Sequence, residues 1–482
     1  MDGWGLIGLE IAVIVAGAAV LLLGQWARDA EQRRQLGYGA ILVLAAVFAA
    51  SFVVLAEGPR FAFGKIYVMD ELALFFKRLF LLAAIFTLLM AVELADQLGA
   101  AAEYYALTLF ALAGMMFAAS AHSFVLLYVS LELITVCFYV LAGFRRDLPK
   151  SLEAGVKYLV IGALAGGFMV FGIALIYGAT GTLDFQELAQ RASDPGADRL
   201  LLLGLFLAAI GLGFKLAAAP FHVWAPDVYQ GAPPSTAAFL AVGSTGAGLV
   251  LLIRLLHTAL PGLAVQWRPA LALVGCVSVL FGVLCAVPQR SLSRMMGYSS
   301  VANAGFILLA LSAGGADGVA AALFYMAAYL FGVMGAFSAL TAAERAGSLE
   351  NAPMLEGLRR RFPLLGLAAM ASMVSLAGVP PTGGFFGKLT LFKALFGELG
   401  AGAWVGRTIA LGLLGTAIAL YFYLKVVQAV CLEEDLPKAS GPGPSRAVNA
   451  AAAFCVAGVL WLGVWPGSMM NLAYYAAHAL GL

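Results

Sequence analysis

An apolar run at residues 200–219 sets the first constraint on this chain, because it is long enough to cross a lipid bilayer but contains Lys215 and ends next to Pro220. A membrane-spanning helix needs about 20 apolar residues. A lysine at the bilayer centre costs about 2.5–3.5 kcal/mol on insertion scales, and the proline interrupts the helical hydrogen bonds. Such features are tolerated where protein or a water-filled cavity satisfies the freed groups. The run therefore predicts a polar cavity inside a membrane protein, and hence transport; the alternative is a Lys215 that snorkels to the surface.

A second stretch repeats this combination at residues 376–395. It places Pro380 and Pro381 inside an apolar segment and Lys388 two turns further on. Two broken segments, each with its own lysine, favour a role inside the membrane over snorkelling.

Composition supports the membrane class and excludes several others. The chain is 63% hydrophobic and 11% charged, with a mean hydropathy of +0.96, which excludes an ordinary soluble globule. A net charge of +2 predicts no nucleic-acid partner. The five cysteines lack CxxC spacing and the four histidines are dispersed, so we expect neither disulfides nor a metal site. Without a glycine-rich loop between a strand and a helix we expect no cofactor; the GSTGAG run at 243–248 is interpreted as close helix packing.

The apolar segments predict an all-α membrane protein of about fourteen transmembrane helices in a single integral membrane domain, residues 1–482. The first seven are expected at 5–24, 38–56, 71–95, 104–119, 122–143, 152–178 and 200–219, the seventh with a broken continuation to 232. The last seven are expected at 235–257, 269–287, 297–313, 317–342, 363–397, 404–431 and 447–465, with a break near Pro380 in the twelfth.

The two broken helices, seven and twelve, lie five helices apart and would therefore cross the membrane in opposite senses. Inverted-topology repeats generate such an arrangement and place each site at a discontinuous helix near the midplane. We expect helices 4–8, residues 104–257, to form the first repeat and helices 9–13, residues 269–431, to form the second.

The orientation follows from the loops, because cytoplasmic loops carry an excess of Lys and Arg. With loops assigned alternately to the two sides, one side collects most of the basic residues, among them Arg28, Arg145, Arg290 and Arg359. This distribution predicts that both termini lie outside the cytoplasm.

The ionisable residues inside the predicted spans differ in how far they lie from a surface. Glu132 stands in mid-span, and a buried carboxylate must pair, be protonated or line water. Lys157 lies near its helix start and fits either a cavity mouth or snorkelling. We expect Lys77 to snorkel, as we do Arg78, and the same interpretation is favoured for Arg254.

One glutamate and two lysines thus remain as candidate carriers. Burial favours the neutral form of a lysine, whereas a nearby carboxylate favours the charged form. A change in the distance between Glu132 and Lys215 would therefore make the lysine hold or release a proton. A proton carrier needs this chemistry, and it requires no cofactor.

Three motifs resemble a known family. GFKLAAAPFHVWAPDVYQGAP at 213–233, QRSLSRMMGYSSVANAGF at 289–306 and GVPPTGGFFGKLTLF at 378–392 are similar to the antiporter-like subunits of respiratory complex I, the proton-translocating NADH:quinone oxidoreductase, and to Mrp-type sodium/proton antiporters. The similarity covers about residues 70–430. LYVSLELITVCFYVLAGF at 127–144 resembles the subunit N branch.

The resemblance implies a role for each candidate residue. Glu132 would modulate the charge of Lys215, the central proton-holding lysine, and Lys388 would deliver protons towards the outside. Lys157 falls where the family has a lysine near the inner mouth of the channel.

The chain departs from the family at the eighth helix, where Thr245 stands in place of a lysine that usually relays protons between the two halves. A hydroxyl orients water but stores no charge at neutral pH. We expect ordered water with Ser244, Thr245, Tyr325 or Tyr329 to bridge the gap. Slower or absent lateral transfer is one alternative, and a packing role for the tyrosines is another.

The resemblance thus implies a subunit of a bacterial inner-membrane translocase, which moves protons from cytoplasm to periplasm while partner subunits reduce quinone. It implies other membrane subunits and the lipid bilayer as partners, and no redox centre in this chain. The alternatives are a secondary cation/proton antiporter of the Mrp type and a membrane subunit of a related hydrogenase.

Overall fold

Helices form nearly the whole structure, which is a computed structural model that describes residues 3–54, 58–191, 199–347, 354–431 and 443–482. The first half contains α1 (Gly8–Gly24), α2 (Ala30–Ala50), α3 (Glu71–Glu93), α4 (Ala101–Ala119), α5 (Phe124–Ala142), α6 (Pro149–Thr180), α7 (Phe185–Arg191), α8 (Arg199–Lys215), α9 (Ala225–Gly231), α10 (Pro234–Phe239) and α11 (Thr245–Arg254). The second half contains α12 (Ala264–Ala286), α13 (Leu292–Ser312), α14 (Gly315–Arg345), α15 (Leu358–Arg361), α16 (Pro363–Ala377), α17 (Gly383–Gly397), α18 (Ala403–Cys431), α19 (Arg446–Val464) and α20 (Pro466–His478).

The predicted all-α membrane class is confirmed. Within the described ranges, 10 helical segments are long and apolar enough to cross a membrane, and two shorter apolar helices, α1 and α16, accompany them. The count of fourteen spans and the division into inverted repeats stay predictions. One small hairpin was not expected from the sequence: β1 (Arg60–Ala62) pairs antiparallel with β2 (Tyr67–Met69).

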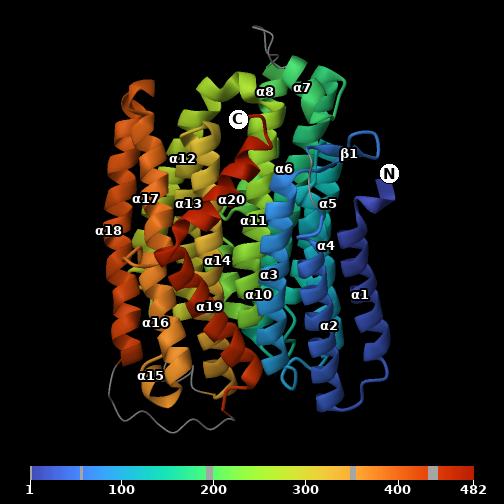
Figure 1. Cartoon of the computed structure of the whole chain (residues 1–482), viewed down its shortest axis with the longest axis vertical. Helices are drawn as coiled ribbons and strands as arrows, with labels where there is room; N and C mark the ends of the chain where they lie inside the picture. Colours follow the sequence, from blue (N-terminus) through green and yellow to red (C-terminus); the bar gives the residue numbers. More distant parts are fainter. Residues whose placement is uncertain (1–2, 55–57, 192–198, 348–353, 432–442) are drawn as a thin grey trace.

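The long helices run roughly side by side along the long axis of the molecule (Figure 1). The α1–α2 pair forms one edge of this view and α17 and α18 form the other, and the marks for both termini lie in the upper half. The centre is occupied by α14, which contacts α3, α10, α13, α16, α17, α19 and α20. An apolar helix that is surrounded on all sides in this way is buried almost throughout its length.

Two helices are broken where the sequence places proline. The first break separates α8, which ends at Lys215, from α9, and the second separates α16, which ends at Ala377, from α17. A cis X–Pro peptide bond lies in each break, at Ala219–Pro220 and at Pro380–Pro381. Each break leaves the carbonyl groups of a helix end without helical partners, as helix termini generally do.

Glycines set the close approach of neighbouring helices. A Cβ at Gly172 of α6 would lie 2.5 Å from the carbonyl oxygen of Gly204 of α8, so only glycine fits there. The GSTGAG run also packs closely, because a Cβ at Gly248 would lie 3.0 Å from the Cβ of Lys215. This agrees with our interpretation of the run as a packing motif.

The expectation that Lys77 snorkels is wrong. Its side chain is fully buried and forms an ion pair of 2.7 Å with the equally buried Glu10 of α1. The Lys77 ammonium also donates a hydrogen bond of 2.7 Å to the hydroxyl of Tyr67, which in turn donates to Glu10 at 3.0 Å. Sequence reasoning counted only the distance of Lys77 from its helix end, whereas a partner on another helix holds the charge inside.

The expectation that Arg254 snorkels is also wrong, because a partner elsewhere in the chain holds its charge inside. Arg254 is 2% exposed and binds both carboxylate oxygens of Asp70, at 2.7 and 3.0 Å. Its Nε also donates to the carbonyl oxygen of Ala119 at the end of α4. Arg78 donates to the carbonyl oxygen of Ser51 at 2.9 Å. These bonds tie α2, α3, α4 and α11 together.

Candidate functional site

Lys215 lies at the last position of α8, directly before the first break. The side chain is 4% exposed, and within the described ranges its Nζ has no hydrogen-bond partner. Nζ lies 5.9 Å from the ring centroid of Tyr158 and 5.7 Å from that of Phe214. The C-terminal end of a helix carries partial negative charge, and aromatic faces also attract cations. The surroundings thus attract an ammonium group without fixing it by a hydrogen bond.

Glu132 of α5 lines the same cavity as Lys215. This cavity has a volume of about 10 Å³ and also contains Thr135, Gly166 and Met169 in its wall. One water molecule needs about 10–15 Å³ of such space. The carboxylate points to α6, where a Cβ at Gly166 would lie 2.9 Å from Glu132 Oε1. The structure therefore brings together the glutamate and the lysine that the sequence singled out.

Tyr158, whose ring lies near Lys215 Nζ, and the start of α11 carry buried hydroxyl groups without partners among the described residues. In the part of the chain that the structure describes, the hydroxyls of Tyr158, Ser244 and Thr245 are buried and make no hydrogen bond. Ser244 ends a π-helical turn, Leu240–Ser244, that leads into α11. Buried polar groups are nearly always hydrogen-bonded, to protein or to ordered water. The cluster therefore has the chemistry of a hydrated site.

Lys388 of α17 has a different environment from that of Lys215. It is 5% exposed, and its Nζ donates hydrogen bonds of 3.0 Å to the carbonyl oxygens of Leu376 and of Ala377, in the last turn of α16. Nζ also lies 5.0 Å from the ring centroid of Phe306. Lys388 thus satisfies carbonyl groups that the second break leaves free. It does not line the cavity shared by Glu132 and Lys215.

Tyr325 and Tyr329 of α14 lie on the Lys388 side of the molecule. Both line a cavity of about 10 Å³ together with Asn303, Ser375 and Leu376. The Tyr325 hydroxyl donates a hydrogen bond of 2.7 Å to Asn303 Oδ1. Thr245 and the tyrosines are connected only through their neighbours in sequence. Gly246 follows Thr245 on α11, and a Cβ at Gly246 would lie 3.3 Å from Cε of Met326, which follows Tyr325 on α14.

A row of polar side chains on α13 was missed as a candidate by sequence reasoning. Tyr229 of α9 donates a hydrogen bond of 2.9 Å to Ser300. The adjacent Ser299 bonds the hydroxyl of Tyr423, and Asn303 donates to both of these residues. We name Tyr229, Ser299, Ser300, Asn303, Tyr325 and Tyr423 the polar row. The signal was present in the sequence as Ser299, Ser300 and Asn303 within an apolar helix, but it was used only for the resemblance.

Lys157 of α6 belongs to a charged cluster around Asp227 of α9. One carboxylate oxygen of Asp227 lies 2.5 Å from Lys157 Nζ, and the other lies 2.7 Å from Arg294 Nη1 of α13. Glu153 also pairs with Lys157, at 2.5 Å. Glu153, Asp227, Gln230 and Arg294 line a cavity of about 110 Å³ beside the starts of α6 and α13. Lys157 is not part of this wall, but it is bound to two of the residues that are, Asp227 and Glu153.

Among the described residues there is no group of three or more His, Cys, Asp and Glu side chains that could hold a metal ion. The site consists of ionisable side chains, hydroxyls and small cavities. Such an arrangement can hold and pass protons, because it contains titratable groups next to polar groups that bind water.

The fold and the site define the class: a multi-pass, antiporter-like membrane protein with lysines at two broken helices. The family described as "NADH:quinone oxidoreductase/Mrp antiporter, TM" matches residues 121–416. NADH-quinone oxidoreductase subunit N from Desulforamulus reducens is 36% identical over 99% of this chain and 98% of its own length. Subunit N from Moorella thermoacetica is 36% identical over 98% of each chain. The chain therefore belongs to the subunit N family of NADH-quinone oxidoreductase.

Solved structures agree with this assignment. A chain of respiratory complex I from Thermus thermophilus, solved with bound aureothin, has a TM-score of 0.78 and 34% identity, and the match covers 97% of this chain and 99% of that one. A chain of the Mrp complex from Dietzia sp. DQ12-45-1b has a TM-score of 0.83 at 23% identity, over 98% of this chain and 97% of that one, which shows a shared fold. The relatives are thus membrane subunits of multi-subunit complexes.

Proposed function

We propose that this chain translocates protons across the bacterial inner membrane as one subunit of an NADH:quinone oxidoreductase, while partner subunits oxidise NADH and reduce quinone. The observation that carries the proposal is the cavity shared by Glu132 and Lys215, in which the ammonium nitrogen has no hydrogen-bond partner among the described residues. The family assignment supports an NADH:quinone oxidoreductase as the complex in which this proton translocation takes place.

The mechanism starts from the variable attraction between Glu132 and Lys215. With the carboxylate near, the lysine holds its proton; with the carboxylate withdrawn, the apolar surroundings favour the neutral amine and the proton leaves. No electron carrier is needed for this step. Coupling to the redox reaction is therefore electrostatic and conformational, and it is passed to Glu132 from neighbouring charges.

The polar row is the proposed lateral route between the two halves. It starts at Tyr229 on α9 and Ser300 on α13, and it continues from the adjacent Ser299 through Asn303 to Tyr325, beside the cavity that includes Leu376. Among the described residues no hydrogen bond joins Ser300 to Ser299, so water carries the proton across this step. The carbonyl of Leu376 accepts a hydrogen bond from Lys388. A route through α13 avoids the need for a lysine at Thr245, and the hydroxyls of Thr245 and Ser244 then hold water beside Lys215.

The proposed direction is from the cytoplasm, past Asp227 and Lys157, to Lys215, and then over the polar row to Lys388 and the periplasm. The basic loops between the predicted spans support a cytoplasmic position for the mouth at Asp227, and they support a periplasmic position for both termini. The larger cavity of about 110 Å³ beside Asp227 suits an inlet for water.

The test is Lys215→Ala in the assembled complex. Proton pumping per quinone reduced should fall at least about tenfold, which corresponds to about 1.4 kcal/mol in the barrier. Pumping is measured by the quenching of a pH-sensitive dye in membrane vesicles, together with NADH oxidation. The matched control is Lys425→Ala, because Lys425 lies in the long apolar helix α18 but is exposed. Normal pumping in a fully assembled Lys215→Ala complex would refute the proposal.

Two further results would favour the rival functions. A sodium-dependent proton exchange that persists in the chain purified without redox partners would indicate an Mrp-type antiporter. A Glu132→Gln complex that pumps normally would indicate a subunit without a proton channel, because a scaffold has no need of the carboxylate charge.

A further inference from the structure

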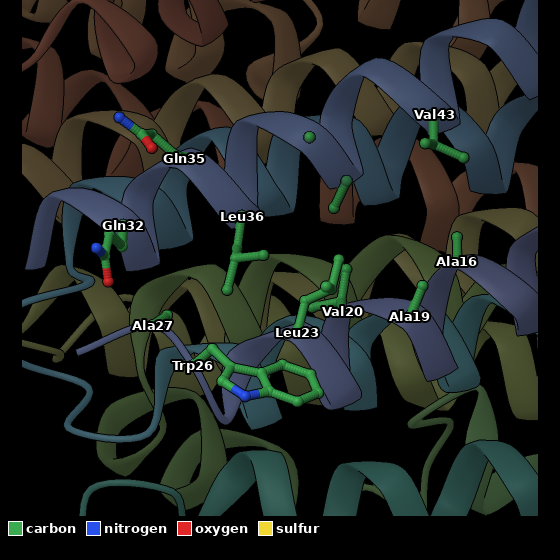
Figure 2. Close-up of a pocket in the computed structure, with 12 residues that line it drawn as sticks. Ala16, Ala19, Val20, Leu23, Trp26, Ala27, Gln32, Gln35, Leu36 and Val43 are labelled. Atoms are coloured by element: carbon green, nitrogen blue, oxygen red, sulfur yellow. The ribbon is translucent and has the colours of Figure 1, made fainter. Parts of the chain in front are cut away.

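An open groove lies between α1 and α2, at the edge of the molecule away from the proposed channel (Figures 1 and 2). Its volume is about 510 Å³. Its wall is formed by residues between Ala16 and Ala27, from α1 and the turn after it, and by residues of α2 between Gln32 and Val43. On the opposite side, close glycine contacts hold the two helices on the bundle: a Cβ at Gly24 would lie 2.3 Å from that of Ala102, and one at Gly37 would lie 2.5 Å from Val92 Cγ2.

The polarity of the groove changes along its length. Figure 2 shows Gln32 and Trp26 at one end and Ala16 and Val43 at the other, with Leu23 and Leu36 between them. Trp26 is 68% exposed, and exposed tryptophans are typical of the level of the lipid headgroups. The groove is thus apolar over most of its length and polar at the α1–α2 turn.

The length of the groove corresponds to one leaflet of a bilayer. From Ala16 to Ala27 the wall covers twelve residues of chain, mostly helix, and the eleven steps between them rise roughly 16 Å at 1.5 Å per residue. The hydrocarbon core of a bilayer is about 30 Å thick, so the groove spans about half of it. A single acyl chain has this reach, whereas a transmembrane helix of a partner would cover the full thickness.

The α1–α2 turn carries charged residues of both signs, which lie in sequence between Ala27 and Gln35 of the groove wall. In the described structure the side chains of Arg28, Asp29 and Glu31 form no ion pair, and Asp29 makes no cap hydrogen bond to α2. Arg34, by contrast, is paired with Asp96. The carbonyl of the Gln32 side chain accepts a hydrogen bond from the Arg28 backbone at 2.8 Å, which leaves its NH₂ group as a donor. A purely anionic headgroup would meet two carboxylates here.

We propose that this groove binds a zwitterionic phospholipid with a primary ammonium headgroup, of the phosphatidylethanolamine type. One acyl chain lies along Val43, Leu36 and Leu23. The phosphate accepts hydrogen bonds from Arg28 and Gln32, and the ammonium group pairs with Asp29 and Glu31. The bound lipid seals α1 against α2 on their outer side.

The first test fills the groove with Gly39→Leu. No atom lies within 4 Å of a Cβ placed at Gly39, so the new side chain enters the groove without a clash in the protein. In native mass spectrometry of the full chain from phosphatidylethanolamine nanodiscs, the retained lipid should fall about tenfold. The control is Ala45→Leu, an exposed position of α2 outside the groove wall, which should retain the lipid. Equal retention in both variants would overturn the site.

The second test addresses the headgroup. In nanodiscs of defined composition, phosphatidylethanolamine should be retained about tenfold better than phosphatidylglycerol, which lacks the ammonium, and than phosphatidylcholine, whose ammonium has no N–H donor. Glu31→Gln with Asp29→Asn should remove this preference. A preference for phosphatidylglycerol, or none, would overturn the proposed headgroup. A cross-link from the Gly39→Cys side chain to another subunit in the assembled complex would show that a protein occupies the groove, and would overturn the proposed lipid.

Discussion

Lys215 and Lys388 occupy comparable places, each beside a break that contains a cis proline, but their nitrogen atoms have opposite environments. Lys215 Nζ has no hydrogen-bond partner among the described residues and shares a cavity with a glutamate. Lys388 Nζ bonds two carbonyl oxygens at 3.0 Å. A lysine without a fixed partner responds to the charge of Glu132, whereas a lysine held by carbonyl groups responds much less. In the proposed mechanism the switching step therefore belongs to the first break, and the second break has the more constant role.

The strongest test of this difference is to replace each lysine by methionine and to measure the free energy of unfolding. Lys388→Met leaves two buried carbonyl groups without a partner and should lower the free energy of unfolding by about 1–3 kcal/mol. Lys215→Met removes a buried, unpartnered polar group and should leave the free energy of unfolding unchanged or raise it by about 1–3 kcal/mol. Thermal unfolding of the purified chain, followed by tryptophan fluorescence, measures both.

The control for this pair is Lys393→Met, because Lys393 lies on α17 with Lys388 but is exposed. It should change the free energy of unfolding by less than about 0.5 kcal/mol. If both buried lysines shift the stability in the same direction, the distinction between a free and a fixed ammonium group is wrong.

A second, smaller effect is expected from moving Glu132 without removing it. A Cβ at Gly166 would lie 2.9 Å from Glu132 Oε1, so Gly166→Ala should displace the carboxylate and lower the pumping rate by about three- to tenfold. Gly167→Ala is the matched control, because nothing lies within 4 Å of its Cβ. Equal pumping in the two variants would argue against a distance-dependent role of the glutamate.

The smallest effects concern the route between the two lysines. Tyr229→Phe removes the hydrogen bond to Ser300 and should slow pumping about fivefold, whereas Thr245→Val should slow it about twofold, because only water loses a partner. Both rates come from the vesicle assay. The reverse order, with Thr245→Val the slower variant, would place the lateral route on α11 instead of the polar row.

The sequence was sufficient for the broken helices and for the first pair of site residues, because proline and a charge inside an apolar run are local signals. Glu132 and Lys215 were predicted as partners and line one cavity. The buried pair of Glu10 and Lys77 was not predicted, because its members lie far apart in the sequence and meet only through helix packing. The bonds of Lys388 were missed for a related reason: backbone carbonyls carry no sequence signal.

The roles of Glu132, Lys157, Lys215, Thr245, Tyr325, Tyr329 and Lys388 stay predictions until the variants are measured. Their positions already restrict the possible mechanisms. Tyr325 and Tyr329 line the cavity that also contains Asn303 and Leu376, and neither lines the cavity shared by Glu132 and Lys215.

The carboxylate of Asp227 has one consequence for the motion of the whole bundle. Its two oxygens bind cations on different helices, Lys157 on α6 and Arg294 on α13. When α6 and α13 move apart, the seven-residue α9 must follow one of them and give up its bond to the other. A separation of the two halves at this point therefore costs one ion pair, whichever helix α9 follows.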